Sequence, residues 1–457
     1  MGCLITWCPG GSSMRRHSPR RPVKEKWIAS QFGDSLWKSS PACVQCSTIM
    51  IAPSFSRELL ERYGSPLYVY DLDEAERQAK ALFELLPKGA QVLYSVKANP
   101  LPEVCAALKN AGCRVEIASL LELEVVREAG FAPDQIMCSG PGKTASLVRD
   151  MLVAGVTHFS CDSWYDLERL AGVASATKKP ANALLRLQLL GAPSGSVGVG
   201  AMQSHFGADP AELLNSGAAR VAALQGAELA GIHIYSGGQI QTADKLASTF
   251  EHAIHLAEEI AQAGVPLRLV DLGGGFPWPF GTSDDPVDIS ALREKLQRVN
   301  AQRRLTAEAK LWFESGRYLV ASSGTLLSTV LDVKVWNGKP HIILDTGMIH
   351  LGGMAGLGRI YRAVASIEPL AGRDGALLQS VDVVGPTDYA LDYVTRDASV
   401  PALKPGDAVS IPNVGAYGLT ASLVAFTGSQ PPAEVCCRGS SVVAVHRLRT
   451  GHERIRA

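Results

Sequence analysis

The residue of this sequence that points most directly to a chemical reaction is Lys97. The residues before it, 92–96, are mostly apolar and suit a buried strand, which Asn99-Pro100 then ends. We therefore predict a strand over 92–97 with the lysine at its carboxyl end. Burial lowers the pKa of a lysine, and the neutral amine can form a Schiff base. The alternative is a lysine that only reaches solvent at the end of a strand.

Two later segments carry residue types that suit a phosphorylated ligand, and a third is rich in glycine. Gly273–Gly275 follow a predicted strand over 267–272, where bare backbone N–H groups can bind phosphate; a tight turn is the alternative. Glu314 and Arg317 follow the next strand, where a carboxylate can hold a proton on a ring nitrogen and an arginine can pair with phosphate. Their alternative is a surface ion pair. The segment 413–418 is rich in glycine and alone predicts only a turn.

The elements that must position these residues form a repeating pattern from residue 91 to about 320. Apolar segments alternate with helical ones, several of which end in Ala-Gly, as a left-handed C-cap requires. We predict eight strands, over 92–97, 114–119, 135–139, 158–162, 183–189, 230–236, 267–272 and 311–314. Helices are predicted over 102–110, 120–129, 144–154, 164–171, 242–263 and 289–302. This alternation predicts an α/β fold, a (β/α)8 TIM-like barrel, with a doubly wound sheet as the alternative.

In such a barrel, the carboxyl ends of all strands meet on one face, which carries the active site. Polar residues and glycines at the predicted strand ends should therefore be neighbours. They are Lys97, Ser119, Asp162, His233, Tyr235, Gly273, Gly274, Gly275 and Glu314.

The pattern changes to alternating strands after about residue 320, which predicts a C-terminal β-rich domain. Its strands are expected over 325–335, 341–345, 380–384, 408–412 and 441–445, and an early strand over 65–71. Residues 1–49 show neither a helical nor a strand period. The predicted organisation is a disordered extension (1–49), an N-terminal segment that packs with the β domain (50–74), the barrel (75–319) and the β domain (320–457).

The composition excludes several classes of function. Lys and Arg number 44, as do Asp and Glu, so the chain has no basic excess for nucleic acid or membrane surfaces. No apolar run is long enough to span a bilayer. Cys43 and Cys46 have metal-site spacing but lack a second pair, so we predict no metal. Without a secretory signal, the ten cysteines indicate a reduced, cytoplasmic protein.

Six motifs occur in the order typical of one enzyme family. They are Tyr-Ser-Val-Lys-Ala-Asn (94–99), His-Ile-Tyr-Ser-Gly-Gly-Gln (233–239), Gly-Gly-Gly-Phe (273–276), Glu-Ser-Gly-Arg (314–317), Gly-Pro-Thr (385–387) and Gly-Ala-Tyr (415–417). With them, residues 65–445 resemble the fold-type III pyridoxal-phosphate decarboxylases, which include the ornithine, arginine and diaminopimelate decarboxylases. The resemblance implies an alanine-racemase-like barrel and the cofactor pyridoxal 5'-phosphate (PLP).

The resemblance also implies a role for each motif. Lys97 would hold the cofactor covalently, and Glu314 would keep its ring nitrogen protonated. The phosphate would be held by Gly273, Gly274, Gly275, Arg317 and Tyr417. The family's enzymes are head-to-tail homodimers, so residues 385–387 are expected to complete the active site of a partner subunit.

Four positions depart from the family pattern. Tyr235 stands where a histidine usually stacks on the cofactor ring, with His233 two residues earlier on the same strand face. Gly238 replaces a serine that normally binds the phosphate. Asp388 replaces the cysteine that protonates the intermediate after loss of CO2, a role open to an aspartate of raised pKa. Tyr389 replaces the acidic residue that binds a distal amine.

These features predict α-decarboxylation of an amino acid. Within the family, the sequence most resembles the branch that acts on aminoacyl groups tethered to carrier proteins. The alternatives are a decarboxylase of a free diamino acid (diaminopimelate, ornithine or lysine), a non-catalytic homologue with a regulatory role, and a racemase. Lys97, Glu314, Arg317 and Tyr417 favour an enzyme, whereas Asp388 favours the non-catalytic alternative.

Overall fold

The structure of this chain is a computed structural model that describes residues 51–188, 206–352, 364–372, 377–453 and 455. The predicted extension, including Cys43 and Cys46, lies outside these residues. Among the helices that are described, none combines the length and the apolar character needed to cross a membrane.

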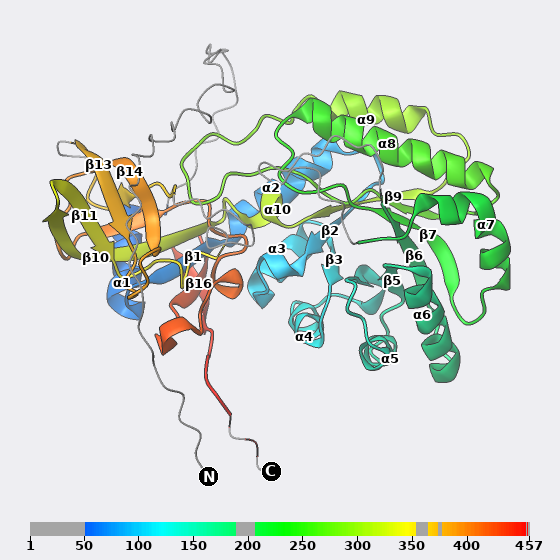
Figure 1. The fold of residues 1–457 in the computed structure, drawn as a ribbon, viewed down its shortest axis with the longest axis horizontal. Helices are drawn as coiled ribbons and strands as arrows, with labels where there is room; N and C mark the ends of the chain where they lie inside the picture. The colour runs from blue at the N-terminus through cyan, green and yellow to red at the C-terminus, as the bar shows by residue number, and fades with distance from the viewer. Residues whose placement is uncertain (1–50, 189–205, 353–363, 373–376, 454, 456–457) are drawn as a thin grey trace, which may run out of the picture. The chain divides into compact units, whose positions relative to one another are not determined.

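Eight parallel strands close into a barrel in chain order, and helices lie outside the ring (Figure 1). The barrel predicted from the sequence is therefore confirmed, and the doubly wound sheet is wrong. The strands are β2 (Gln91–Ser95), β3 (Arg114–Ile117), β4 (Ile136–Cys138), β5 (His158–Cys161), β6 (Asn182–Leu187), β7 (Glu228–Ile234), β8 (Leu269–Asp271) and β9 (Lys310–Ser315).

Six helices of the described chain correspond to predicted ones. The helices of the described residues are α1 (Pro53–Tyr63), α2 (Leu72–Leu85), α3 (Pro102–Asn110), α4 (Leu120–Glu128), α5 (Ala145–Val153), α6 (Trp164–Thr177), α7 (Pro210–Ala223), α8 (Ala243–Gln262), α9 (Leu292–Ala301) and α10 (Arg317–Val320). The prediction lacked α1, α2, α7 and the single turn α10, and it ended α6 too early.

Short polar residues start the helices where the strands end. The side chains of Ser119, Ser163 and Thr242 accept hydrogen bonds from backbone N–H groups in the first turns of α4, α6 and α8, at 3.1–3.2 Å. Such caps satisfy donors that have no partner within the helix. The Ala-Gly pairs end helices as predicted, because Gly112, Gly130, Gly155 and Gly264 all have positive φ.

A second sheet of nine strands is built mainly from the C-terminal part of the chain. Its order is β14-β13-β11-β10-β1-β16-β17, with β15 paired to β10 and β12 paired to β15. The strands are β1 (Leu67–Asp71), β10 (Gly324–Trp336), β11 (Lys339–Leu344), β12 (Glu368–Pro369), β13 (Leu377–Val384), β14 (Tyr393–Pro401), β15 (Ala408–Ile411), β16 (Ala433–Arg438) and β17 (Ser441–Arg447). The early strand β1 lies inside this sheet, antiparallel to β10 and parallel to β16.

The barrel interior consists of an apolar layer with a polar layer beyond it. The apolar layer is a closed cluster of Leu93, Met137, Leu184, Ala230, Leu269 and Trp312. Side chains two residues further along a strand face the same side, toward the carboxyl end. Five of these positions hold Ser95, Ser139, Arg186, Asp271 and Glu314. Together with Glu116, Ser160 and His233 at the same end of the barrel they form a set that we call the polar layer. The apolar layer fills the barrel, and the polar layer forms the floor of the site.

Candidate active site

A cavity of about 550 Å³ opens at the carboxyl ends of the barrel strands. Its lining brings together most of the residues that the sequence predicts for the site. Those present are Lys97, His233, Tyr235, Gly238, Gly274, Gly275, Glu314, Arg317 and Tyr417. Gly273 lies next to this lining, and its carbonyl accepts a hydrogen bond from the N–H of Glu314 at 2.8 Å.

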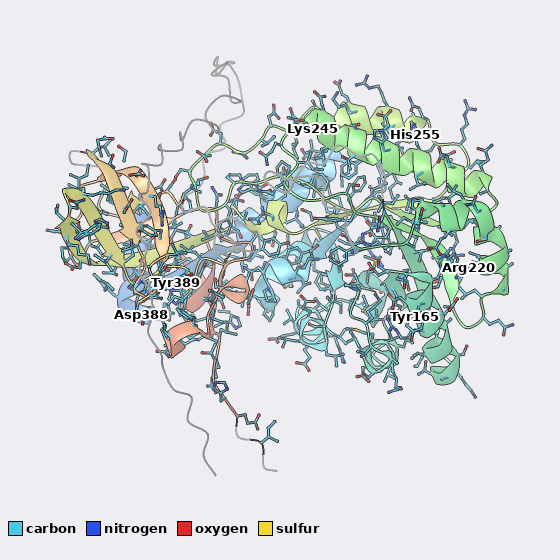
Figure 2. The ribbon with its side chains drawn as sticks, in the orientation of Figure 1. Tyr165, Arg220, Lys245, His255, Asp388 and Tyr389 are labelled. Atoms are coloured by element: carbon cyan, nitrogen blue, oxygen red, sulfur yellow. The ribbon has the colours of Figure 1, made fainter. Side chains whose placement is uncertain are left out.

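Three other predicted residues lie elsewhere. Ser119 caps α4 instead of facing the cavity. Asp162 does not line the cavity, but its carboxylate is 3.8 Å from the guanidinium of Arg186, which does line it. Asp388 is exposed beside Tyr389 in the loop that follows β13, and both are labelled near the second sheet in Figure 2. Neither residue lines the cavity of its own chain.

Lys97 stands in a single 3-10 turn, Val96–Ala98, and not in the strand as predicted, because β2 already ends at Ser95. The turn directs the lysine into the cavity, and 57% of its side-chain surface is accessible. Its Nζ lies 3.5 Å from Oε1 of Glu116. The lysine is therefore a paired cation in an open cavity.

Burial does lower the pKa of Lys97, but the neutral amine expected from the sequence does not result. The carboxylate of Glu116 raises the pKa of Lys97, burial lowers it less, and Glu314 adds to the rise. Two acidic side chains in the same polar layer stabilise the ammonium form. In the protein alone Lys97 is charged, so it must lose a proton before it can act as a nucleophile.

Glu116 is a functional residue that the sequence analysis missed. Its carboxylate accepts hydrogen bonds from the hydroxyls of Ser95, at 2.8 Å, and Ser139. Burial alone would raise the pKa of Glu116, but Lys97 and these two hydroxyls outweigh burial and lower it to about 2. A charged residue within a buried strand was the available signal, the same one that singled out Lys97. Arg186 in β6 has the same signal and was also missed.

The triple-glycine turn fits closely between its neighbouring strands. A Cβ at Gly273 would lie 2.5 Å from the carbonyl oxygen of Ile234, and Gly273 has a φ of +65°. At Gly274 a Cβ would lie 2.5 Å from the carbonyl oxygen of Glu314. Only glycine permits both approaches. Side-chain-free backbone therefore lines the cavity at this turn.

Arg317 and Tyr417 meet at the same side of the cavity. The guanidinium carbon of Arg317 is 5.0 Å from the ring centre of Tyr417. Its Nη1 is buried and has no hydrogen-bond partner among the described residues. Burial lowers the pKa of Arg317 and raises that of Tyr417. A buried guanidinium N–H without a partner can bind an anionic ligand.

Tyr417 reaches the barrel because the loop after β15 is anchored there. The backbone N–H of Tyr417 donates to the carbonyl of Ala98, the residue after Lys97, at 2.7 Å. The side-chain amide of Asn99 donates to the carbonyl of Gly415 at 3.1 Å. Asn413 accepts a hydrogen bond from Nε1 of Trp278 at 2.9 Å. These contacts fix one segment of the second sheet beside the lysine.

Tyr235 and His233 point into the same site from the end of β7, but they have different surroundings. Tyr235 lies at the cavity with 39% of its surface accessible, 5.6 Å from the guanidinium of Arg186. Its hydroxyl would be 3.2 Å from a Cβ at Gly238. His233 is 1% exposed, with Nδ1 2.7 Å from Oγ of Ser160 and Nε2 3.5 Å from Oε1 of Glu314. Tyr235 is thus available for stacking, whereas His233 is a buried partner of Glu314.

Comparison with known proteins identifies the class to which this site belongs. Residues 72–321 match the family described as pyridoxal-dependent decarboxylase, pyridoxal-binding domain. The chain is 30% identical over 406 residues to the L-glutamyl-BtrI acyl-carrier protein decarboxylase of Niallia circulans, covering 86% of this chain and 94% of that protein. It is 32% identical over 403 residues to the diaminopimelate decarboxylase of Pseudomonas aeruginosa, covering 86% and 93%. The crystal structure of a SrLDC mutant in complex with PLP matches with a TM-score of 0.71, 26% identity and coverage of 83% and 94%.

The chain therefore belongs to the pyridoxal-dependent decarboxylases. It is a carboxy-lyase that acts on amino acids, and its cofactor is PLP. The alternatives of a racemase and of a non-catalytic homologue are not supported.

The residues present fit PLP. The cavity offers a lysine amine, bare backbone at Gly274 and Gly275, and a buried Arg317 N–H without a partner. Oε1 of Glu314 is also buried without a hydrogen-bond partner among the described residues. A ring N–H and a phosphate would satisfy these unpaired groups.

Proposed function

We propose that this enzyme removes the α-carboxylate of an amino acid that is carried on a carrier protein as a thioester of its side-chain carboxyl, which leaves the α-carboxylate free. The observation that carries the proposal is the similarity to the Niallia circulans decarboxylase, whose name gives an L-glutamyl-carrier protein as its substrate. The match covers 94% of that protein, so it includes both the barrel and the second sheet.

The loop after β13 supports a substrate without a charged distal amine. Tyr389 takes the place of the acidic residue that would pair with such an amine, and its ring packs edge-on against Phe426 with centres 6.3 Å apart. An aromatic pair gives a tethered, uncharged chain an apolar surface. Asp388, immediately before it, is exposed and free to reach another molecule.

We assign the cofactor to the cavity through residues of this chain. Lys97 would hold it covalently through Nζ, and the backbone of Gly273, Gly274 and Gly275 would bind its phosphate. Arg317 and Tyr417 would also bind the phosphate, which would supply the unpaired Nη1 of Arg317 with a partner. Because Gly238 has no side chain, the hydroxyl of Tyr235 has room beside it.

The chemistry follows from these positions. When bound, PLP supplies an electron sink for the electron pair that is released as the α-carboxylate leaves as CO2. Glu314 would accept a hydrogen bond from the ring nitrogen, and Tyr235 would stack on the ring. When the amine of Lys97 is not joined to the cofactor, its ammonium form pairs with the carboxylate of Glu116, which lies 3.5 Å away.

We further propose a head-to-tail homodimer in which Asp388 of the partner subunit completes each cavity and donates the proton that replaces CO2. The exposed position of Asp388, outside the cavity lining of its own chain, supports this assignment.

The domain boundaries (50–74, 75–319, 320–457) and a cytoplasmic location also remain proposals. The pairing of β1 with β10 and β16 supports grouping 50–74 with the β domain. All six cysteines among the described residues are free thiols, which supports a reducing compartment.

Release of CO2 from carrier-bound and free amino acids tests the substrate. We expect turnover of an L-glutamyl group linked to a carrier protein through its side-chain carboxyl, and at least about 100-fold lower kcat/KM for free lysine, ornithine and diaminopimelate. Lys97→Ala is the control and should abolish both the turnover and the cofactor's visible absorbance band.

A free diamino acid is the second candidate, and the similarity to the Pseudomonas aeruginosa diaminopimelate decarboxylase favours it. Turnover of free diaminopimelate alone, with none of the carrier-bound substrate, would establish this candidate and contradict tethering. Both outcomes leave the decarboxylase assignment intact.

A further inference from the structure

Three buried side chains of the polar layer each carry a polar atom without a hydrogen-bond partner among the described residues. These atoms are Nε2 of His233, Oδ2 of Asp271 and Oε1 of Glu314. All three residues are more than nine-tenths buried, and one polar atom from each lies within 4.8 Å of the others. Unpaired buried polar atoms cost free energy, so three of them on side chains this close together indicate a shared function.

His233 lies between a hydroxyl and a carboxylate. Its Nδ1 is 2.7 Å from Oγ of Ser160 on β5, and its Nε2 is 3.5 Å from Oε1 of Glu314 on β9. The barrel register pairs His233 with Arg186 on β6 and with Asp271 on β8. The charged groups that face the imidazole are therefore Glu314, Asp271 and Arg186, with Glu116 on β3 also close enough to interact.

The charges of this cluster favour a protonated imidazole. Burial alone would lower the pKa of His233, but the carboxylates of Glu314 and Asp271 outweigh burial and raise it. Burial and the Glu314 carboxylate raise the pKa of Asp271. The imidazole of His233 therefore keeps its second ring proton to a higher pH than usual. The carboxyl group of Asp271 likewise keeps its single proton to a higher pH than usual.

We propose that His233 holds both ring protons and shares the Nε2 proton with Glu314, which keeps Glu314 ionised although Asp271 lies beside it. The inference rests on the proposed function, in which Glu314 accepts the hydrogen bond from the cofactor's ring nitrogen. Two buried carboxylates this close would otherwise compete for one proton. If Glu314 took that proton, it would stabilise a protonated ring nitrogen less.

His233 is thus a positioning residue that acts through Glu314. Asp271 links the same cluster to the phosphate turn, because its Oδ1 accepts the N–H of Gly273 at 2.9 Å. The ring-nitrogen end and the phosphate end of the cofactor site therefore share one buried acid–base cluster.

A divalent cation between the side chains of His233, Asp271 and Glu314 is the alternative to a shared proton. An imidazole that carries both protons has no lone pair for a metal, and the guanidinium of Arg186 disfavours a second cation nearby. The protonation state of His233 therefore separates the two alternatives.

The first measurement uses protein without cofactor, labelled with 15N-histidine. We expect the imidazole of His233 to be doubly protonated at about pH 7, where His158 is neutral because burial lowers the pKa of His158 to about 4. His233→Gln and His158→Gln assign the two signals. A neutral His233, or stoichiometric zinc that shifts its signals, overturns the proposal.

The second measurement uses protein loaded with PLP labelled with 15N in the ring. We expect a protonated ring nitrogen in the native protein and in His158→Gln. In His233→Gln the pKa of the ring nitrogen should fall by about one unit or more. An unchanged titration in His233→Gln overturns the inference and leaves the proposed function standing. A native protein that binds no PLP contradicts the proposed function, and the cofactor-free spectra still decide the state of His233.

Discussion

Nζ of Lys97 lies 3.5 Å from Oε1 of Glu116, on the strand next to the one that leads into the lysine turn. The pair explains why an accessible catalytic lysine remains charged in the protein alone. The same carboxylate is held by Ser95 and Ser139, so its position is fixed by three partners. The charge of Glu116 must therefore influence how the protein takes up its cofactor.

Replacing Glu116 by Gln should make covalent capture of PLP faster at neutral pH. Without the carboxylate the pKa of Lys97 falls, and the neutral amine that reacts with the cofactor aldehyde becomes more abundant. We expect the pH at which capture is half-maximal to fall by about one unit or more. The measurement is the rate at which the visible absorbance band appears when PLP is added over a range of pH. Glu128→Gln, an exposed change on α4, is the control. Identical pH profiles for both variants would rule out this role of Glu116.

Glu116 should also control the acid stability of the protein. Its pKa in the folded state, about 2, lies below its usual value of 4.5. The resulting stability is fully present above pH 4.5 and is lost as pH falls toward 2. Up to about 3 kcal/mol of the free energy of unfolding depends on this shift. Urea unfolding at about pH 6 and about pH 3 should give a smaller loss in Glu116→Gln than in the native protein. Equal losses in both proteins would contradict the prediction.

The strands and most helices could be predicted because each has a clear local period. Helix α7 had a usable signal, Asp209 followed by Pro210, but it comes after residues 189–205, where the sequence has no clear pattern. The polar layer was only partly predicted. His233 and Glu314 stood in recognisable motifs, whereas Glu116 and Arg186 are single charges inside strands.

The charge of Lys97 could not be predicted from its own segment. Glu116 is 19 residues away in the chain and becomes its neighbour only when β2 and β3 pair. Burial was the only effect that the sequence could show, and burial lowers the pKa of Lys97. The contact with Glu116 across the strands is larger, so the net shift of this pKa is upward. Interactions between strands set both the charge and the geometry of this site.

Gly415→Ala should weaken PLP binding by displacing Tyr417 from the cavity. A Cβ at Gly415 would lie 1.9 Å from the carbonyl oxygen of Val320, so the loop must move away from the barrel. We expect at least about tenfold weaker binding, measured by titration of the visible band. Gly172→Ala is the control, because a Cβ there meets nothing within 4 Å.

Tyr417→Phe separates loss of the tyrosine from misfolding of the Gly415→Ala variant. It retains the ring and the backbone contact to Ala98, so the fold should be kept while the hydroxyl is lost. We expect weaker PLP binding in this variant too, with an unchanged circular dichroism spectrum. Native affinity in both variants would place the phosphate away from Tyr417.

The proposed shared active site predicts that two inactive variants restore activity when mixed. Lys97→Ala removes the amine of the barrel, and Asp388→Ala removes the proton donor that the partner supplies. A heterodimer would contain one intact site, so equal mixing after dissociation should give about a quarter of the native activity. Lys97→Ala mixed with Arg317→Ala is the control, because both changes lie in the same cavity and neither heterodimer site is intact. Recovery in both mixtures, or in neither, would contradict the shared site, as would a fully active Asp388→Ala enzyme.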